Sequence, residues 1–307
     1  MTHLDFLNTN HPIRRTQAEK KAFADYILSL YPYAKIETTK NGKNQNIVIG
    51  NPLTAKAVCT AHYDTPARAA FPNIMIPRCR ILFWLYQFVP VIVILAVSFA
   101  ALFICKAAFD LEREMYFSVF LVVYYLLFYF MYFGFKNKHN HNDNTSGVAA
   151  VLSVFDSLTE EQRADYAFIL FDNEEKGKKG SKAFFEDHKD EMKEKLILNF
   201  DCVGNGDNIV FVAMKGAEEK AEYSALRDSF TPANGFSVSF FPKKGSESNS
   251  DYKSFPCGIG CMACKKAKSG LLYTPYIHTA RDTVASNENI AYITESMLRF
   301  VNAISKE

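Results

Sequence analysis

Residues 81–105 form the apolar sequence ILFWLYQFVPVIVILAVSFAALFIC, in which no side chain is charged. As an α-helix this segment would be about 37 Å long, and a second apolar segment, residues 115–135, would be about 31 Å long. Either helix would cross the hydrocarbon core of a membrane, which is about 30 Å thick. The connector, residues 106–114, is short and polar, so the pair is predicted to form a transmembrane helical hairpin.

A hairpin returns the chain to the side of the membrane that it left, so the segments before and after it can belong to one domain. We expect the first part of the main domain in residues 1–78, the hairpin insertion in 79–136, and the remainder of the domain in 137–307. Two alternatives remain open here. The apolar pair could be buried in a large soluble core, or it could lie on the surface as a hydrophobic lid.

The charges around the hairpin predict its orientation. Arg78 and Arg80 precede the first helix, and Lys136 and Lys138 follow the second. The connector carries three acidic side chains against two basic ones. Because positive flanks favour the cytoplasmic side, we expect an integral membrane protein whose main domain faces the cytoplasm. The seven cysteines, odd in number and irregularly spaced, agree with a reducing compartment.

Outside the hairpin, short apolar segments alternate with amphipathic ones. Strands are expected over residues 34–40, 46–50, 56–62, 166–172, 195–201, 208–214, 236–241 and 257–264. Helices are expected over residues 15–31, 146–158, 180–193, 217–230 and 287–304. This alternation predicts an α/β fold with a mostly parallel mixed sheet that is flanked by helices on both faces.

Side chains that bind metals follow the expected ends of several strands. His62, Glu174, Glu175 and Asp201 each lie at or just after an apolar strand. In open α/β sheets, ligands bind beyond the carboxyl ends of the strands, so these four side chains are expected to meet at one edge. Taken singly, each has an ordinary explanation, such as a helix cap or a solvated glutamate. The prediction depends on their combination.

With Asp143 and His278, the set offers two imidazoles and several carboxylates, which suit two divalent ions of the zinc class. Two such ions about 3.5–4 Å apart, bridged by a carboxylate, polarise a carbonyl and lower the pKa of a bound water. A further carboxylate would then act as general base on that water.

At these segments the chain resembles the M28 family of di-zinc aminopeptidases. The family has, in order, an HxD motif, a DNxSG segment, an EExGxxGS segment, a strand-end Asp and a late His. Here they are HYD at 62–64, DNTSG at 143–147, EEKGKKGS at 174–181, NFD at 199–201 and IHT at 277–279. The resemblance runs from about residue 12 to residue 304, with the hairpin as an insertion between the first two motifs.

The resemblance implies a zinc-exopeptidase-like fold and a role for each of seven residues. Five would bind two divalent metal ions, expected to be Zn²⁺: His62 and Asp201 on one ion, Glu175 and His278 on the other, and Asp143 between them. Glu174 would be the general base. Asp64 would orient His62 from behind. One departure concerns substrate binding: Tyr252 stands where the family often has the His of a Ser-Asp-His segment.

The activity implied is that of a membrane-anchored hydrolase, a metallo-aminopeptidase that removes N-terminal residues from peptides or cleaves related amides. Its partners would be a peptide or aminoacyl-amide substrate and the lipid bilayer. Two alternatives are an inactive peptidase-like membrane receptor or scaffold, and a single-zinc glutaminyl cyclase. The complete set of ligands and the intact Glu174-Glu175 pair argue against both.

Two weaker signals do not change this prediction. Cys257, Cys261 and Cys264 are interpreted as packing residues of a buried strand rather than thiolate ligands, since no second cysteine pair or nearby histidine completes a site. A net charge of +2, with 22% charged residues, indicates no nucleic-acid-binding surface.

Overall fold

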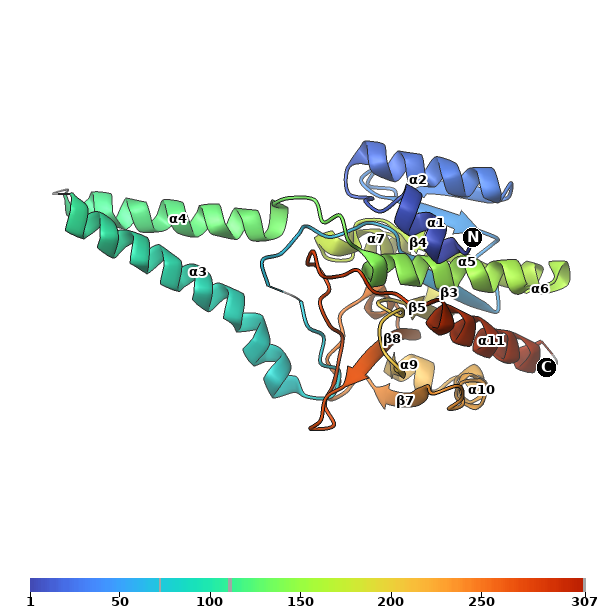
Figure 1. The fold of residues 1–307 in the computed structure, drawn as a ribbon. Helices are drawn as coiled ribbons and strands as arrows, with labels where there is room; N and C mark the ends of the chain where they lie inside the picture. Colours follow the sequence, from blue (N-terminus) through green and yellow to red (C-terminus); the bar gives the residue numbers. More distant parts are fainter. Residues whose placement is uncertain (72, 110–111, 306–307) are drawn as a thin grey trace.

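The computed structural model describes residues 1–71, 73–109 and 112–305, with the side chains of residues 132 and 133 left out. Residues 110 and 111 of the predicted connector lie outside the described residues. Over the described part, nine strands form one sheet in the order β1-β2-β4-β3-β5-β8-β6-β7, with β9 paired to β8 (Figure 1). The strands are β1 (Ala34–Thr38), β2 (Gln45–Ile49), β3 (Ala57–His62), β4 (Tyr166–Phe171), β5 (Leu196–Phe200), β6 (Asn208–Ala213), β7 (Ser237–Pro242), β8 (Gly258–Lys266) and β9 (Leu272–Tyr273).

The sheet is parallel in its centre and mixed toward its edges. Strands β4, β3, β5 and β8 are parallel neighbours. Strand β2 joins β4 antiparallel, and β6 joins β8 antiparallel. The carboxyl ends of the central strands therefore meet at one edge of the sheet.

Alternate residues of the central strands supply two cores, one on each face of the sheet. In β4, Tyr166, Phe168 and Leu170 belong to the larger core, whereas Ile169 and Phe171 belong to the smaller one. Since successive side chains of a strand point to opposite faces, a sheet with helices on both sides needs apolar residues at nearly every position. This explains why the sequence of β4 is continuously apolar.

The helices divide between the two faces. They are α1 (His3–Asn10), α2 (Gln17–Leu30), α3 (Arg80–Ala108), α4 (Arg113–Phe133), α5 (Gly147–Ser157), α6 (Glu160–Asp165), α7 (Lys179–Asp187), α8 (Lys189–Met192), α9 (Lys215–Glu218), α10 (Ala221–Ser229) and α11 (Asn287–Ile304), with short helical turns at η1 (His141–Ser146), η2 (Glu174–Lys176) and η3 (Asp251–Ser254). Helices α1, α2, α5, α10 and α11 contribute to the larger core, and α7 and α8 to the smaller one.

The predicted mixed α/β sheet flanked by helices is confirmed, with differences in detail. Helix α2 begins after Thr16 because the Thr16 side chain accepts a hydrogen bond from the backbone of Glu19, whose carboxylate binds the Thr16 backbone in return. The helix expected over 180–193 is interrupted at His188, where φ is −127°. The helix expected over 217–230 is likewise divided into α9 and α10.

The two long apolar helices are also confirmed, and they project from the domain as a hairpin (Figure 1). The rings of Phe99 and Phe120 lie 4.8 Å apart and join α3 to α4. Toward the domain the helices diverge, so α3 begins and α4 ends at separate places (Figure 1). Both are long and apolar enough to cross a membrane by length and composition.

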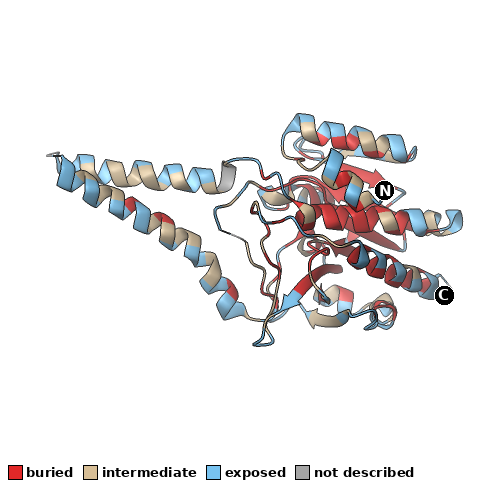
Figure 2. Cartoon of the chain, in the orientation of Figure 1, coloured by how far each residue is buried: buried red, intermediate tan, exposed pale blue. Residues whose placement is uncertain are grey.

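The hairpin is not the buried core of a soluble protein. In the most apolar windows of α3 and α4, 11% and 0% of the residues are buried within the chain. Figure 2 shows the same contrast, with buried residues concentrated around the sheet and the hairpin largely exposed. Of the two alternatives to a transmembrane hairpin, the buried helical pair is therefore excluded for this chain.

Hydrogen bonds hold both ends of the hairpin to the domain. The backbone N–H of Arg68 donates to the carbonyl of Phe135 at 2.8 Å, just after α4. At the other end the backbone N–H of Glu247 donates to the carbonyl of Pro77 at 3.0 Å. The carboxylate of Glu247 lies 3.2 Å from Nε of Arg80. The segment after α4 is thus bonded to the segment before α3, and the start of α3 is bonded to the loop between β7 and η3.

The smaller core provides a test of this packing. Phe184 on α7 is fully buried, whereas its neighbour Phe185 is only partly buried. We expect Phe184→Ala to lower the free energy of unfolding of the domain by about 3–5 kcal/mol, because the cavity cannot collapse fully. Phe185→Ala should cost clearly less. Urea titration followed by circular dichroism measures both, and equal losses would contradict this account of the core.

Candidate metal centre

The central parallel strands deliver three groups of polar side chains to one edge of the sheet. His62 is the last residue of β3. Glu174 and Glu175 lie in η2, which begins three residues after the end of β4, and Asp201 directly follows β5. Because β4, β3 and β5 are parallel neighbours, these four residues converge as the sequence predicted.

The two remaining candidates come from loops. Asp143 lies in the turn that precedes α5, and His278 lies in the segment between β9 and α11. His278 has a φ of 63°, in the left-handed region that residues other than glycine seldom adopt. A conformation of this kind persists only where surrounding contacts hold it, and it is frequent at functional sites.

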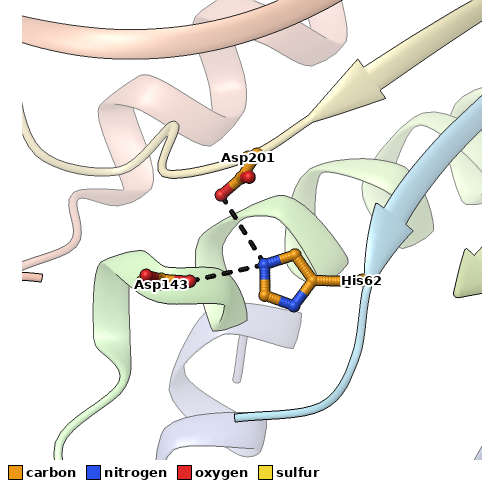
Figure 3. A group of neighbouring side chains, drawn as sticks. All are labelled: His62, Asp143 and Asp201. Atoms are coloured by element: carbon orange, nitrogen blue, oxygen red, sulfur yellow. Dashed lines mark ion pairs between the residues drawn. The ribbon is translucent and has the colours of Figure 1, made fainter. Parts of the chain in front are cut away.

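Asp143 lies between the two imidazoles. Its Oδ1 is 3.4 Å from Nε2 of His62, and its Oδ2 is 3.0 Å from Nε2 of His278. On the first side, Asp201 Oδ1 lies 3.7 Å from the same His62 nitrogen (Figure 3). On the second side, Glu175 Oε2 lies 3.4 Å from the His278 nitrogen. The cluster therefore has two halves that share one carboxylate.

Asp64 connects His62 to the turn that carries the glutamates. The backbone carbonyl of Asp64 lies 3.1 Å from Nδ1 of His62, and because a carbonyl can only accept, this contact needs a proton on Nδ1. The Asp64 carboxylate accepts hydrogen bonds from the backbone N–H groups of Glu174, at 2.9 Å, and Glu175, at 3.2 Å. Asp64 thus directs Nε2 of His62 toward Asp143 and Asp201 and holds η2 beside it.

The donor atoms fit divalent cations. Three groups of side chains each bring their ligand atoms within 4.8 Å of one another: His62, Asp143 and Asp201; His62, Glu174 and Glu175; and Asp143, Glu175 and His278. The buried oxygens Glu175 Oε1 and Asp201 Oδ1 have no hydrogen-bond partner. Because unpaired buried carboxylate oxygens are costly and commonly bind a metal, the cluster is suited to one or more cations.

The shifted pKa values of the glutamates and of His62 also agree with a site for a divalent cation. Burial raises the pKa of Glu175 to about 8 and that of Glu174 well above its ordinary value. Burial acts to lower the pKa of His62, but the neighbouring carboxylates of Asp143, Asp201 and Asp64 outweigh it and raise that pKa well above the ordinary value. A divalent cation would reverse both tendencies, since it favours ionised carboxylates and neutral imidazoles.

Two buried charged residues bond to backbone groups beside the cluster, and the sequence analysis did not identify them. Asp282 accepts the backbone N–H groups of Asn142 and Asp143, at 2.9 and 3.0 Å, and so fixes the turn that presents the Asp143 carboxylate. Arg14 donates to the Tyr63 carbonyl at 2.5 Å. Their partners are distant in sequence, and no local pattern marks them.

Asp251 is the third buried charge that the sequence analysis missed. It is fully buried, neither of its carboxylate oxygens has a hydrogen-bond partner, and burial raises its pKa to about 7. A signal for it existed, because it precedes Tyr252, the position where the sequence departs from the family pattern. Tyr252 itself packs in a core cluster with Val210, Met262 and other residues.

The three cysteines near β8 pack in the interior, as predicted. Cys257 and Cys261 belong to the larger core, and Cys264 belongs to a separate cluster. Burial raises the pKa of all three thiols. They are therefore divided between clusters rather than gathered around a common point.

Comparisons with known proteins place this geometry in context. Residues 136–301, more than half of the chain, match the profile of peptidase family M28. The LapA aminopeptidase of Legionella pneumophila is similar in structure, with a TM-score of 0.54 and 14% identity over 99% of this chain and 68% of that one. LapB from the same organism has a TM-score of 0.52 and 14% identity, over 99% and 71% of the two chains.

BSAP, a zinc aminopeptidase from Bacillus subtilis, has a TM-score of 0.50 and 15% identity over 85% of this chain and 50% of that one. No curated protein sequence matches the chain at a comparable level of significance. At these identities the solved structures establish a shared fold.

Asp282→Asn tests the support of the metal centre. Each carboxylate oxygen of Asp282 accepts one backbone N–H group, from Asn142 or Asp143. In the asparagine variant one of these oxygens is replaced by an NH₂ group, which cannot accept a hydrogen bond, so one of the two backbone N–H groups loses its partner. We expect the affinity for Zn²⁺ to fall about 10–100-fold, as is typical when a residue that orients a ligand is lost. Competition with a fluorescent zinc chelator measures this affinity. The exposed Asp207→Asn is the matched control, and equal affinities for both variants would contradict the role of Asp282.

Proposed function

Because the chain belongs to peptidase family M28, we propose that it is a membrane-anchored aminopeptidase that hydrolyses N-terminal residues of peptides or related amides with two divalent metal ions. Zinc is the proposed metal, since the solved structures of similar fold include a zinc aminopeptidase. The observation that carries the proposal is the position of Asp143. One of its oxygens lies 3.4 Å from His62 and the other 3.0 Å from His278.

The proposed assignment follows the two halves of the cluster. His62 and Asp201 would bind one ion, Glu175 and His278 the other, and Asp143 both. When bound, a pair of such ions would polarise the scissile carbonyl and make a water molecule more acidic. The buried carboxylates without hydrogen-bond partners in both halves support two ions rather than one.

Glu174 is the proposed general base. An oxygen of its carboxylate lies within 4.8 Å of donor atoms of His62 and Glu175, and the side chain lines the cavity beside the metal centre. In this position it would take the proton of the attacking water and pass it to the leaving amine. The backbone carbonyl of Asp64 would keep the His62 ring oriented. The Asp64 carboxylate would hold η2 in place through its bonds to the backbone of Glu174 and Glu175.

We also propose that residues 79–136 insert into the bilayer and that residues 1–78 and 137–307 form one catalytic domain on its cytoplasmic side. The length and apolar composition of α3 and α4 support the insertion. The basic residues Arg78, Arg80, Lys136 and Lys138 at the domain end of the hairpin support the orientation.

The first test is Glu174→Gln. We expect kcat on a panel of aminoacyl fluorogenic amides to fall about 10²–10⁴-fold, because the amide cannot take a proton from water. Metal content, measured by mass spectrometry on detergent-purified protein, should stay at about two ions per chain, because the proposed ligands are intact.

The exposed Glu160→Gln on α6 is the matched control and should keep the parent activity. Wild-type protein that stays metal-free and inactive after reconstitution would defeat the proposed function. One ion per chain would instead favour the alternative of a single-zinc glutaminyl cyclase.

The insertion of the hairpin can be tested with two native cysteines at opposite ends of α3. Cys79 directly precedes the helix and Cys105 lies near its end, whereas the other five cysteines are buried. About 26 residues of helix, roughly 39 Å, would separate the two thiols. In Cys79→Ser only Cys105 remains accessible, and in Cys105→Ser only Cys79 does. If α3 spans the bilayer, a membrane-impermeant thiol reagent should label these two thiols from opposite sides of sealed vesicles. Labelling of both from one side would indicate a surface lid.

A further inference from the structure

One cavity of about 680 Å³ connects the candidate metal centre with the inserted hairpin. Its volume lies in the range of about 300–1,000 Å³ that is typical of ligand sites. At one end His62, Glu174 and Asp201 line it. The hairpin side chains that line its other end are Phe83, Tyr86, Gln87, Pro90, Val91 and Met131. The insertion therefore forms part of the cavity wall.

The lining residues of α3 form one stripe along the helix, here called the α3 stripe (residues 83, 86, 87, 90 and 91). Their spacing of i, i+3, i+4, i+7 and i+8 is that of a single helix face. Farther along the same face, Ile94 and Ser98 are buried, in the part of α3 that packs against α4. Nearer the domain the two helices diverge, so this face meets the cavity instead of a partner helix (Figure 1).

The lining of the cavity combines charged side chains of the domain with apolar side chains of the hairpin. Apart from Tyr86 and Gln87, the side chains of the α3 stripe present only carbon atoms. The amide of Gln87 donates to Oδ1 of Asn73 at 3.3 Å, which ties the stripe to the loop before α3. Met75 and Ile277, from loops of the domain, add further apolar surface to the same cavity.

We propose that the α3 stripe binds the apolar residues of a peptide substrate whose N-terminal amide bond lies at the metal centre. From Phe83 to Val91 the helix rises about 12 Å, which is the length of roughly three to four residues of extended peptide. The substrate class is a peptide with apolar residues at its amino-terminal end, free in solution or held in the bilayer. This inference rests on the proposed function, because it assumes that an amide is cleaved at the metal centre.

Two valines of α3 provide a matched test. Val91 lines the cavity, whereas Val89 is 38% exposed and lies on a different side of the helix. In Val91→Trp the indole would fill the apolar end of the cavity, and in Val89→Trp the same group would point away from it.

The full chain in detergent is assayed with two substrates that share one N-terminal residue. One is an aminoacyl fluorogenic amide, and the other is a peptide that continues with several leucines. For Val91→Trp, we expect the ratio of kcat/KM for the peptide to kcat/KM for the amide to fall about tenfold or more, as for other overpacked sites. For Val89→Trp the ratio should change less than about twofold.

Alanine variants serve if the larger indole prevents folding. Val91→Ala removes two methyl groups from the wall, each worth about fourfold in affinity for an apolar group. The same ratio should therefore fall by up to about 16-fold relative to Val89→Ala. Equal ratios in the Val91 and Val89 variants would overturn the α3 stripe as a substrate wall.

A binding measurement separates this inference from the proposed function. A fluorescein-labelled leucine peptide is titrated with each variant and its anisotropy is followed. A Kd that rises about tenfold in Val91→Trp but not in Val89→Trp supports the wall even if no substrate is cleaved. Equal affinity of the wild-type chain for a matched serine peptide would overturn it. Presenting the leucine peptide free or in lipid vesicles distinguishes the two sources of substrate.

Discussion

The carboxylate of Asp143 between His62 and His278 is the contact on which the rest of the structure depends. It joins three parts of the chain: one before the hairpin, one directly after it, and one near the end of the sequence. Charges of opposite sign at 3.0–3.4 Å in a buried site attract strongly, whereas the neighbouring carboxylates repel one another. A divalent cation between them would relieve that repulsion, so the cluster is suited to a metal ion.

The same contact determines where an insertion can be placed. Because His62 and Asp143 must meet, the chain between them has to leave and return at the same edge of the sheet, and a two-helix hairpin satisfies this condition. The backbone bond from Arg68 to Phe135 closes the loop on the domain side. As a consequence, the first turns of α3 share a cavity with the candidate metal centre.

The fold was predictable where the sequence is strongly patterned. Continuous apolar strands, the apolar helices of the hairpin and the amphipathic α11 were identified to within about three residues, since local composition marks each of them. The short helices α1 and α6 and the two-residue strand β9 were not, because packing rather than composition forms them. Similarly, the expected single helix over 180–193 ends at His188, whose ring packs 4.7 Å from that of Phe184.

The sequence by itself determined the chemistry of the candidate site: the ordered motifs supply two imidazoles and the surrounding carboxylates, and parallel strands bring their ends together. The tertiary structure decided which atoms face each other and what supports them. It directs the two oxygens of Asp143 to different histidines, and it bonds Arg14 to the carbonyl of Tyr63 and Asp282 to the backbone of Asp143. It also decided that α3 lines the cavity. These contacts join residues far apart in the chain, so no local pattern of residue types records them.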